Sequence, residues 1–179
     1  MSDRMGFSLR PQFEGEFTIE RLPDDFMARM ERRVAEGLLQ PGQRHRANYG
    51  VRSSSRDALE FEAEDFLTAY NIGLNHVELV RTGPATVFYR VDFRRWSRFV
   101  TIHGALMGAA ATLVLLVPAV RRDVRSYPQG LVIFWGMVLF WAVVWPRIMT
   151  ALHRPFASKA LERILRDELM RAPHGRAAA

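Results

Sequence analysis

Two long apolar stretches in the second half of the chain constrain its fold more than any other feature. They run over residues 99–120 and 126–146, and neither contains Asp, Glu, Lys or Arg. An α-helix needs about 20 mostly apolar residues to cross the core of a bilayer. Only residues 121–125, three of them arginines, lie between the stretches. The sequence therefore predicts a transmembrane helical hairpin with spans at about 99–120 and 127–146.

The chain is basic, and the position of its charges indicates the partner. Through Ser97 there are 14 Arg against 15 Asp and Glu, whereas from Arg98 onward there are 11 Lys and Arg against 4 Asp and Glu. The excess flanks the apolar stretches, where anionic lipid headgroups attract basic side chains. We therefore expect a bilayer with anionic headgroups as the partner, and no nucleic acid, despite the net charge of +6.

The basic residues beside the two spans also predict their orientation. Two spans place both termini on one side of the membrane. Eight basic residues on that side are close to the spans, against three in the connecting loop: Arg90, Arg94, Arg95, Arg98, Arg147, Arg154, Lys159 and Arg163. Such an excess is typical of cytoplasmic segments. We expect an inner (plasma) membrane protein of a bacterium with both termini in the cytoplasm, since residues 1–11 also show no signal peptide.

Residues 12–95 have the patterns of a small soluble domain. Apolar and acidic side chains alternate over residues 12–21, which predicts a strand. Apolar residues then recur every four positions from Phe26 to Val34, which predicts a helix, and Gly37 is a typical helix end.

Residues 44–90 predict an antiparallel meander made of two hairpins. In the first hairpin, the expected pairs are Val51 with Leu59, Tyr49 with Phe61, and Ala47 with Ala63. In the second, they are Val77 with Tyr89 and Leu79 with Val87, across a Thr82-Gly83-Pro84 loop. Between the hairpins, residues 66–74 fit either a further strand or an irregular connection.

The predicted fold class is α+β: a strand–helix–antiparallel-meander domain, a two-helix transmembrane hairpin and a C-terminal amphipathic helix. The expected parts are a flexible arm (1–11), the soluble domain (12–95), the hairpin (96–150), an amphipathic interfacial helix (151–172) and a disordered tail (173–179). Pro155 is expected to open the amphipathic helix, whose apolar stripe would lie on the membrane surface.

The segment Phe17-Thr18-Ile19-Glu20-Arg21-Leu22-Pro23 precedes the predicted helix, and the meander follows it. Over about the first half of the chain, this order resembles that of helix-grip, START-like lipid-binding domains. The resemblance implies a sheet that grips a helix. In that family a long C-terminal helix closes a cavity, and here the membrane hairpin would have to replace it.

Few residues are of the types that carry chemistry. The chain has no cysteine, which excludes disulfides and thiolate catalysis, and its five histidines form no His-x-x-x-His pair. We therefore expect no metal and no cofactor. The acidic run Glu60, Glu62, Glu64, Asp65 alternates along a predicted strand, where pairing with arginines on the neighbouring strand is expected.

His103 lies inside the first span, where an ionisable residue suggests function. We expect it to pack on Trp145, to reach Arg147, or to sit at the interface with access to headgroups. Trp96, just before that span, is expected to anchor at the interface. The ligand or interface candidates are Trp96, His103, Trp145, Arg147 and His153.

Gly104, Gly108 and Thr112 place small residues along one face of the first span. Small residues let helices approach closely in lipid. This face is therefore expected to pack on the second span. Self-association through the same face is the alternative.

These features predict a membrane-anchored binding or scaffolding module without an evident catalytic site, whose partner besides lipid is another membrane protein or a second copy. Two alternatives stay open. One is a lipid or apolar-ligand binding domain with a cavity lined by Phe17, Tyr49, Phe61 and Tyr89. The other is a membrane enzyme with a dispersed site that includes His76 and Asp92.

Overall fold

The computed structural model describes residues 10–37, 47–71 and 73–171, and the chain divides into two compact units. Among the described residues, those within 11–94 and 153–171 belong to unit 1, and Arg10 and residues 95–152 belong to unit 2. The predicted tail lies outside the described residues, as does nearly all of the predicted arm.

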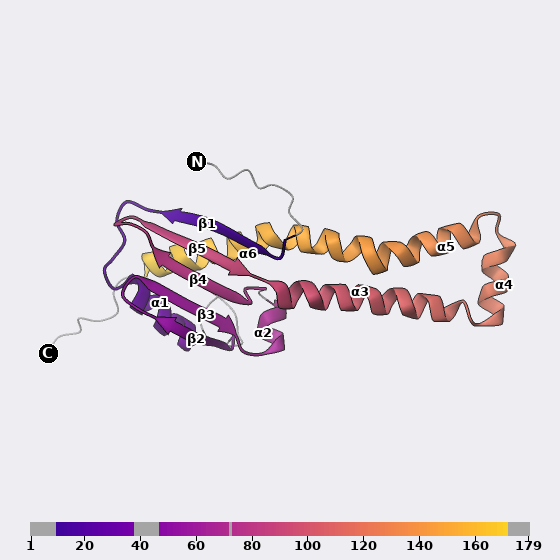
Figure 1. Ribbon diagram of the computed structural model, residues 1–179, viewed down its shortest axis with the longest axis horizontal. Coiled ribbons are helices and arrows are strands. Elements are labelled where there is room, and N and C mark those ends of the chain that lie inside the picture. Colours follow the sequence, from indigo (N-terminus) through magenta and orange to yellow (C-terminus); the bar gives the residue numbers. More distant parts are fainter. Residues whose placement is uncertain (1–9, 38–46, 72, 172–179) are drawn as a thin grey trace. The chain divides into compact units, whose positions relative to one another are not determined.

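Unit 1 contains a five-stranded sheet whose neighbouring strands are all antiparallel. The strands are β1 (Gln12–Thr18), β2 (Tyr49–Ser54), β3 (Ala58–Ala63), β4 (His76–Arg81) and β5 (Thr86–Asp92). Their order is β1-β5-β4-β3-β2, so β1 adds to the edge of the β2–β5 meander beside β5 (Figure 1). Buried and more exposed residues alternate along the strands, which gives the sheet one core face. The predicted α+β class is confirmed.

Two helices cover the core face of the sheet: α1 (Phe26–Ala35) and the C-terminal part of α6 (Trp145–Met170) (Figure 1). The predicted helix at Phe26–Val34 is thus confirmed, and Gly37 follows it with φ 68°. The core joins side chains of the strands to Phe26, Met27, Met30 and Val34 of α1 and to Leu161, Ile164 and Leu165 of α6.

Both predicted hairpins form, but each register was wrong by two residues. Tyr49 pairs with Ala63 and Val51 with Phe61, and a bulge follows between Val51 and Ser53. In the second hairpin, Val77 pairs with Val91 and Leu79 with Tyr89. A shift of two residues keeps every side chain on its face, so the apolar pattern fits both registers equally. The turns decide between them.

Residues 66–71 form a short helix, α2 (Phe66–Asn71), which is neither of the two predicted alternatives. Asp65 starts it, because its carboxylate accepts a hydrogen bond from the Thr68 backbone N–H at 2.6 Å. The same bond is the main reason that the pKa of Asp65 lies below its usual value. Thr68 in turn accepts a bond from the Asn48 N–H, which ties α2 to the start of β2.

The C-terminal helix corrects two predictions. Its apolar stripe was expected to lie on the membrane surface, but Leu161, Ile164 and Leu165 are fully buried within unit 1. The hairpin therefore does not replace a C-terminal helix on the sheet. The chain returns at His153 and supplies one. Pro155 does not open this helix either, because α6 runs unbroken from Trp145 to Met170 and holds Pro155 inside.

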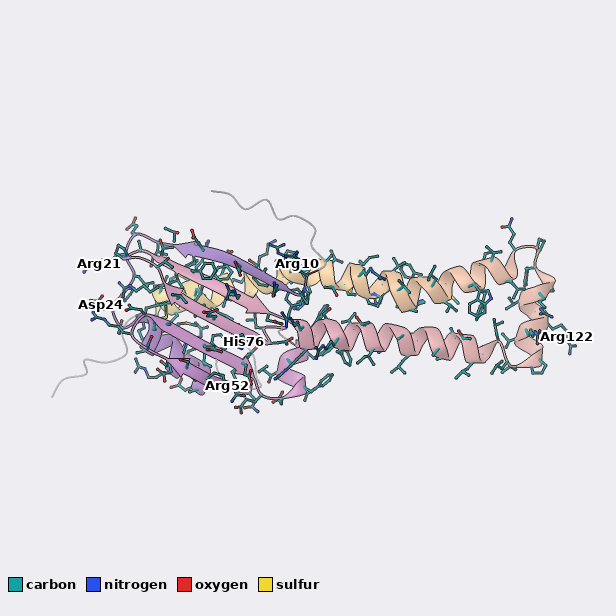
Figure 2. All side chains as sticks on the ribbon, in the orientation of Figure 1. Arg10, Arg21, Asp24, Arg52, His76 and Arg122 are labelled. Carbon is teal, nitrogen blue, oxygen red and sulfur yellow. The ribbon has the colours of Figure 1, made fainter. Side chains whose placement is uncertain are left out.

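Unit 2 is helical: α3 (Arg94–Val114), α4 (Pro118–Ser126), α5 (Gly130–Leu139), a π-helical turn η1 (Phe140–Val144) and the first part of α6. The first apolar helix ends before the predicted residue 120, because Pro118 begins α4. The three arginines expected in the short loop between the spans lie on α4 instead, as Figure 2 shows for Arg122. Two helices, Arg94–Val114 and Gly130–Met170, are long and apolar enough to cross a membrane.

Candidate functional site

The chain leaves unit 1 after Arg94 and returns to it at His153, and both points lie at the same end of the sheet. The buried Phe93 ring lies 5.1 Å from the His153 ring. Asn75, just before β4, donates its backbone N–H to the Asp92 carbonyl at 3.2 Å. Its side chain donates to the Ala69 carbonyl of α2 at 2.9 Å. This end of unit 1 is thus one hydrogen-bonded cluster, which we call the junction cluster.

Gly73 and His153 form the tightest contact of the junction cluster. Gly73 has φ +70°, a left-handed conformation that favours glycine. A Cβ at this position would lie 1.9 Å from His153 Nε2. The imidazole therefore occupies the space that a side chain at position 73 would need.

Burial lowers the pKa of His153 from 6.5 to about 4, although a hydrogen bond with the Gly73 backbone acts in the opposite direction. His153 lies in unit 1, beyond the predicted spans, and is neutral at pH 7. A neutral, enclosed imidazole serves the packing of the junction cluster well.

We expect unit 1 to lose stability as the pH falls from 6.5 to 4. In this interval the unfolded chain binds a proton at His153 more readily than the folded chain, so protonation favours unfolding. The loss attributable to His153 is at most about 3 kcal/mol. Amide hydrogen exchange of β4 and β5 in the full chain, compared with His153→Gln at each pH, measures it. Equal pH dependence in both proteins would show that His153 does not titrate in this way.

A buried ion cluster joins α1 to the end of α6. Arg29 donates to the Glu168 carboxylate at 3.0 Å, and to the backbone carbonyls of Glu168 and Arg171. Arg33 donates to the Ile164 carbonyl at 2.9 Å and to the Glu168 carboxylate at 3.4 Å. Arg29 thus satisfies carbonyls at and just after the end of α6, where the last carbonyls of a helix have no partner within it, and Arg33 adds a bond to the Ile164 carbonyl one turn earlier. Burial, more than any neighbouring charge, lowers the pKa of Arg33.

In unit 2, small residues of α3 meet the π-helical turn η1 and the start of α6. A Cβ on Gly104 would lie 2.6 Å from the Trp141 carbonyl and from the Pro146 ring, and one on Gly108 would lie 2.8 Å from Ala142. Thr112 bonds to its own helix, at the Gly108 carbonyl. Pro146 has no backbone N–H to donate within the helix, and the π-helical turn ends two residues before it. Helices often bend at prolines and at π-helical turns.

The five ligand or interface candidates divide between the two units. His153 belongs to unit 1, whereas Trp96, His103, Trp145 and Arg147 belong to unit 2. His103 is exposed and stacks on Phe99 of its own helix, with ring centroids 6.0 Å apart. Trp145 lies 5.3 Å from Trp141 by the same measure. Arg147 is exposed and donates to the Val143 carbonyl.

The outer face of the sheet carries charges that pair across strands. Arg52 pairs with Glu62, as the sequence predicted for the acidic run. Arg90 pairs with Glu14 at 2.7 Å and with Glu78 at 3.2 Å, and these acids raise its pKa. Among the residues that the structure describes, no group of three or more His, Asp or Glu could hold a metal ion.

His76 and Asp92, named for the enzyme alternative, are direct partners in the register of β4 and β5. Figure 2 shows His76 on the sheet, where its ring lies 3.4 Å from the Glu60 carboxylate. Both side chains are partly exposed. Their neighbours are the ion pairs of the outer face, so the pair is one more cross-strand contact of that face.

The four residues predicted to line a cavity lie in the core instead. Phe17, Tyr49, Phe61 and Tyr89 are each at most 6% exposed. Tyr49 packs edge-on against Phe61, and Tyr89 packs edge-on against Phe13.

No known protein family, curated protein or solved structure matches the chain. Of the junction cluster, only His153 was among the candidates predicted from sequence. Its partners Gly73 and Asn75 were not, although the glycine at position 73 follows the ambiguous segment and precedes a strand.

Proposed function

We propose that the protein is a membrane-anchored binding or scaffolding module. One observation carries the proposal: the most apolar windows of the two long helices are only 17% and 11% buried. A core helix of a soluble protein has a similar composition but is mostly covered. Apolar helix surface of this extent needs lipid or another protein around it.

Charge supports the predicted orientation. On the side of unit 1, basic residues precede the first apolar helix and follow the second. On the other side, α4 carries Arg121, Arg122 and Arg125. The larger number beside unit 1 favours the cytoplasm for unit 1 and both termini. The inner membrane, with its anionic headgroups, then becomes the lipid partner.

Unit 1 supplies the binding part of the module. Its core is filled by aromatic and aliphatic side chains, whereas its outer sheet face is open and lined by paired charges. Such a face suits a polar protein partner better than an apolar ligand. A second membrane protein or a second copy of this chain fits this face equally.

Membrane integration is tested by extracting membranes at alkaline pH and by reporter fusions at both termini. We expect the full chain to stay in the pellet, and a reporter that is active only in the cytoplasm to give signal at either end. A chain with apolar positions of the two helices changed to Ser, for example Leu106, Leu113, Val132 and Ile133, is the control and should be released. Release of the unaltered chain would refute the anchor, and signal only from an extracytoplasmic reporter would reverse the orientation.

A further inference from the structure

The short helix α2 carries three large apolar side chains that are about half exposed or more. Phe66, Leu67 and Tyr70 are 56%, 67% and 42% exposed. The Phe66 and Tyr70 rings stack with centroids 6.0 Å apart. The helix itself is held by the Asp65 cap and by Thr68, which is buried. Exposed large apolar groups on a well-held element indicate an interaction surface.

The position of α2 within unit 1 indicates what this surface meets. Strand β3 runs directly into α2, and β5 runs directly into the start of α3. The junction cluster binds the two together, because Asn75 bonds both the Ala69 carbonyl of α2 and the Asp92 carbonyl of β5. His153, where the chain returns, contacts Gly73 just after α2. The exposed surface therefore lies at the end of unit 1 from which both connections to the apolar helices depart.

We propose that α2 is a second membrane contact, which places Phe66, Leu67 and Tyr70 in the boundary between headgroups and acyl chains. The inference rests on the proposed membrane anchor, since the connections then pin this end of unit 1 to the bilayer surface. Aromatic side chains favour that depth. The arginines beside both connections, at 94, 95, 98 and 154, complement the anionic headgroups there.

This contact has a consequence for unit 1. A hairpin alone leaves a domain free to tilt about its two connections, whereas a third contact fixes its orientation. The loops at the opposite end of the sheet, around Asp57 and Gly83, then point away from the bilayer. Six-residue strands separate them from α2 by about 20 Å. The open sheet face and its edges are thereby presented to a partner in a fixed direction.

The chain has no cysteine, so single cysteines report single positions. The test is nitroxide labelling of Leu67→Cys in the full chain, in vesicles of phosphatidylethanolamine and phosphatidylglycerol. Leu67 is exposed, so the label needs no space in the core. Gly83→Cys is the control in the same unit, because a side chain there meets open space. Leu113→Cys, exposed on α3, reports whether the hairpin is in lipid.

We expect the label at position 67 to be relaxed more by oxygen than by a water-soluble nickel complex, and the label at position 83 to show the reverse. If position 67 behaves like position 83 while position 113 is in lipid, α2 does not enter the bilayer and the anchor stands. If position 113 is also in water, the anchor itself fails. Shielding of position 67 from both reagents would mean that protein covers α2, which overturns the lipid contact.

Discussion

Replacing Glu168 with alanine is expected to lower the free energy of unfolding of unit 1 by about 3–5 kcal/mol. Glu168 is 5% exposed and faces two arginines that are themselves buried, Arg29 at 9% and Arg33 at 2%. Without the carboxylate, two guanidinium groups remain enclosed beside helix carbonyls that only partly balance their charge. Amide hydrogen exchange of β3 and β4 in the full chain, in detergent micelles, measures the loss.

The neighbouring Asp167 provides the matched control. It lies 3.8 Å from Arg33, but its side chain is 30% exposed, so water can replace its charge. Asp167→Ala should cost less than about 1 kcal/mol. A joint replacement of Arg29 and Arg33 by Met and of Glu168 by Leu removes all three charges, and should retain far more stability than Glu168→Ala. Similar small losses for Glu168→Ala and Asp167→Ala would show that the cluster does not hold α6 on α1.

Apolar periodicity was enough to predict most elements of unit 1. The alternation around Phe13 and Phe17 predicted β1, and the four-residue spacing from Phe26 predicted α1, both of which the structure confirms. Registers were harder, because the same pattern fits two alignments that differ by two residues. The bulge after Val51 and the bond from the Thr82 N–H to the Thr86 carbonyl belong to backbone geometry, which side-chain pattern does not report.

The misplaced C-terminal helix has a different cause. An apolar stripe with basic flanks suits a membrane surface and a protein core equally, so Leu161 and Leu165 could not decide between them. The evidence lay in other residues. Glu168 is one of the few acidic residues near the C-terminus, and Arg29 of α1 donates a hydrogen bond to it. Arg33 of α1 donates to the Ile164 carbonyl of the same helix. Their pairing requires that segments more than 130 residues apart in sequence come together.

The junction cluster could not be predicted from sequence for a related reason. His153 follows the apolar stretches and Gly73 precedes them, so only the return of the chain to unit 1 brings the two together. The short α2 was ambiguous because six residues carry little periodicity. Its cap at Asp65, three residues before Thr68, was the readable signal. The site that unites both connections is thus built from residues whose types are individually ordinary.

Replacing Gly73 with alanine is expected to destabilise unit 1 by about 2–4 kcal/mol, from left-handed strain and from a clash with the His153 ring. The φ of +70° and the 1.9 Å approach of a Cβ to His153 Nε2 are the two causes. Gly83→Ala is the matched control, because nothing lies within 4 Å of its Cβ, and should be nearly neutral. Adding His153→Ala to Gly73→Ala removes the clash but keeps the strain. In a double-mutant cycle read by hydrogen exchange of β4 and β5, His153→Ala should therefore lower the free energy of unfolding less in the Gly73→Ala chain than in the unaltered chain. Strictly additive losses would show that the two residues do not share this space, and the junction cluster would lose its central contact.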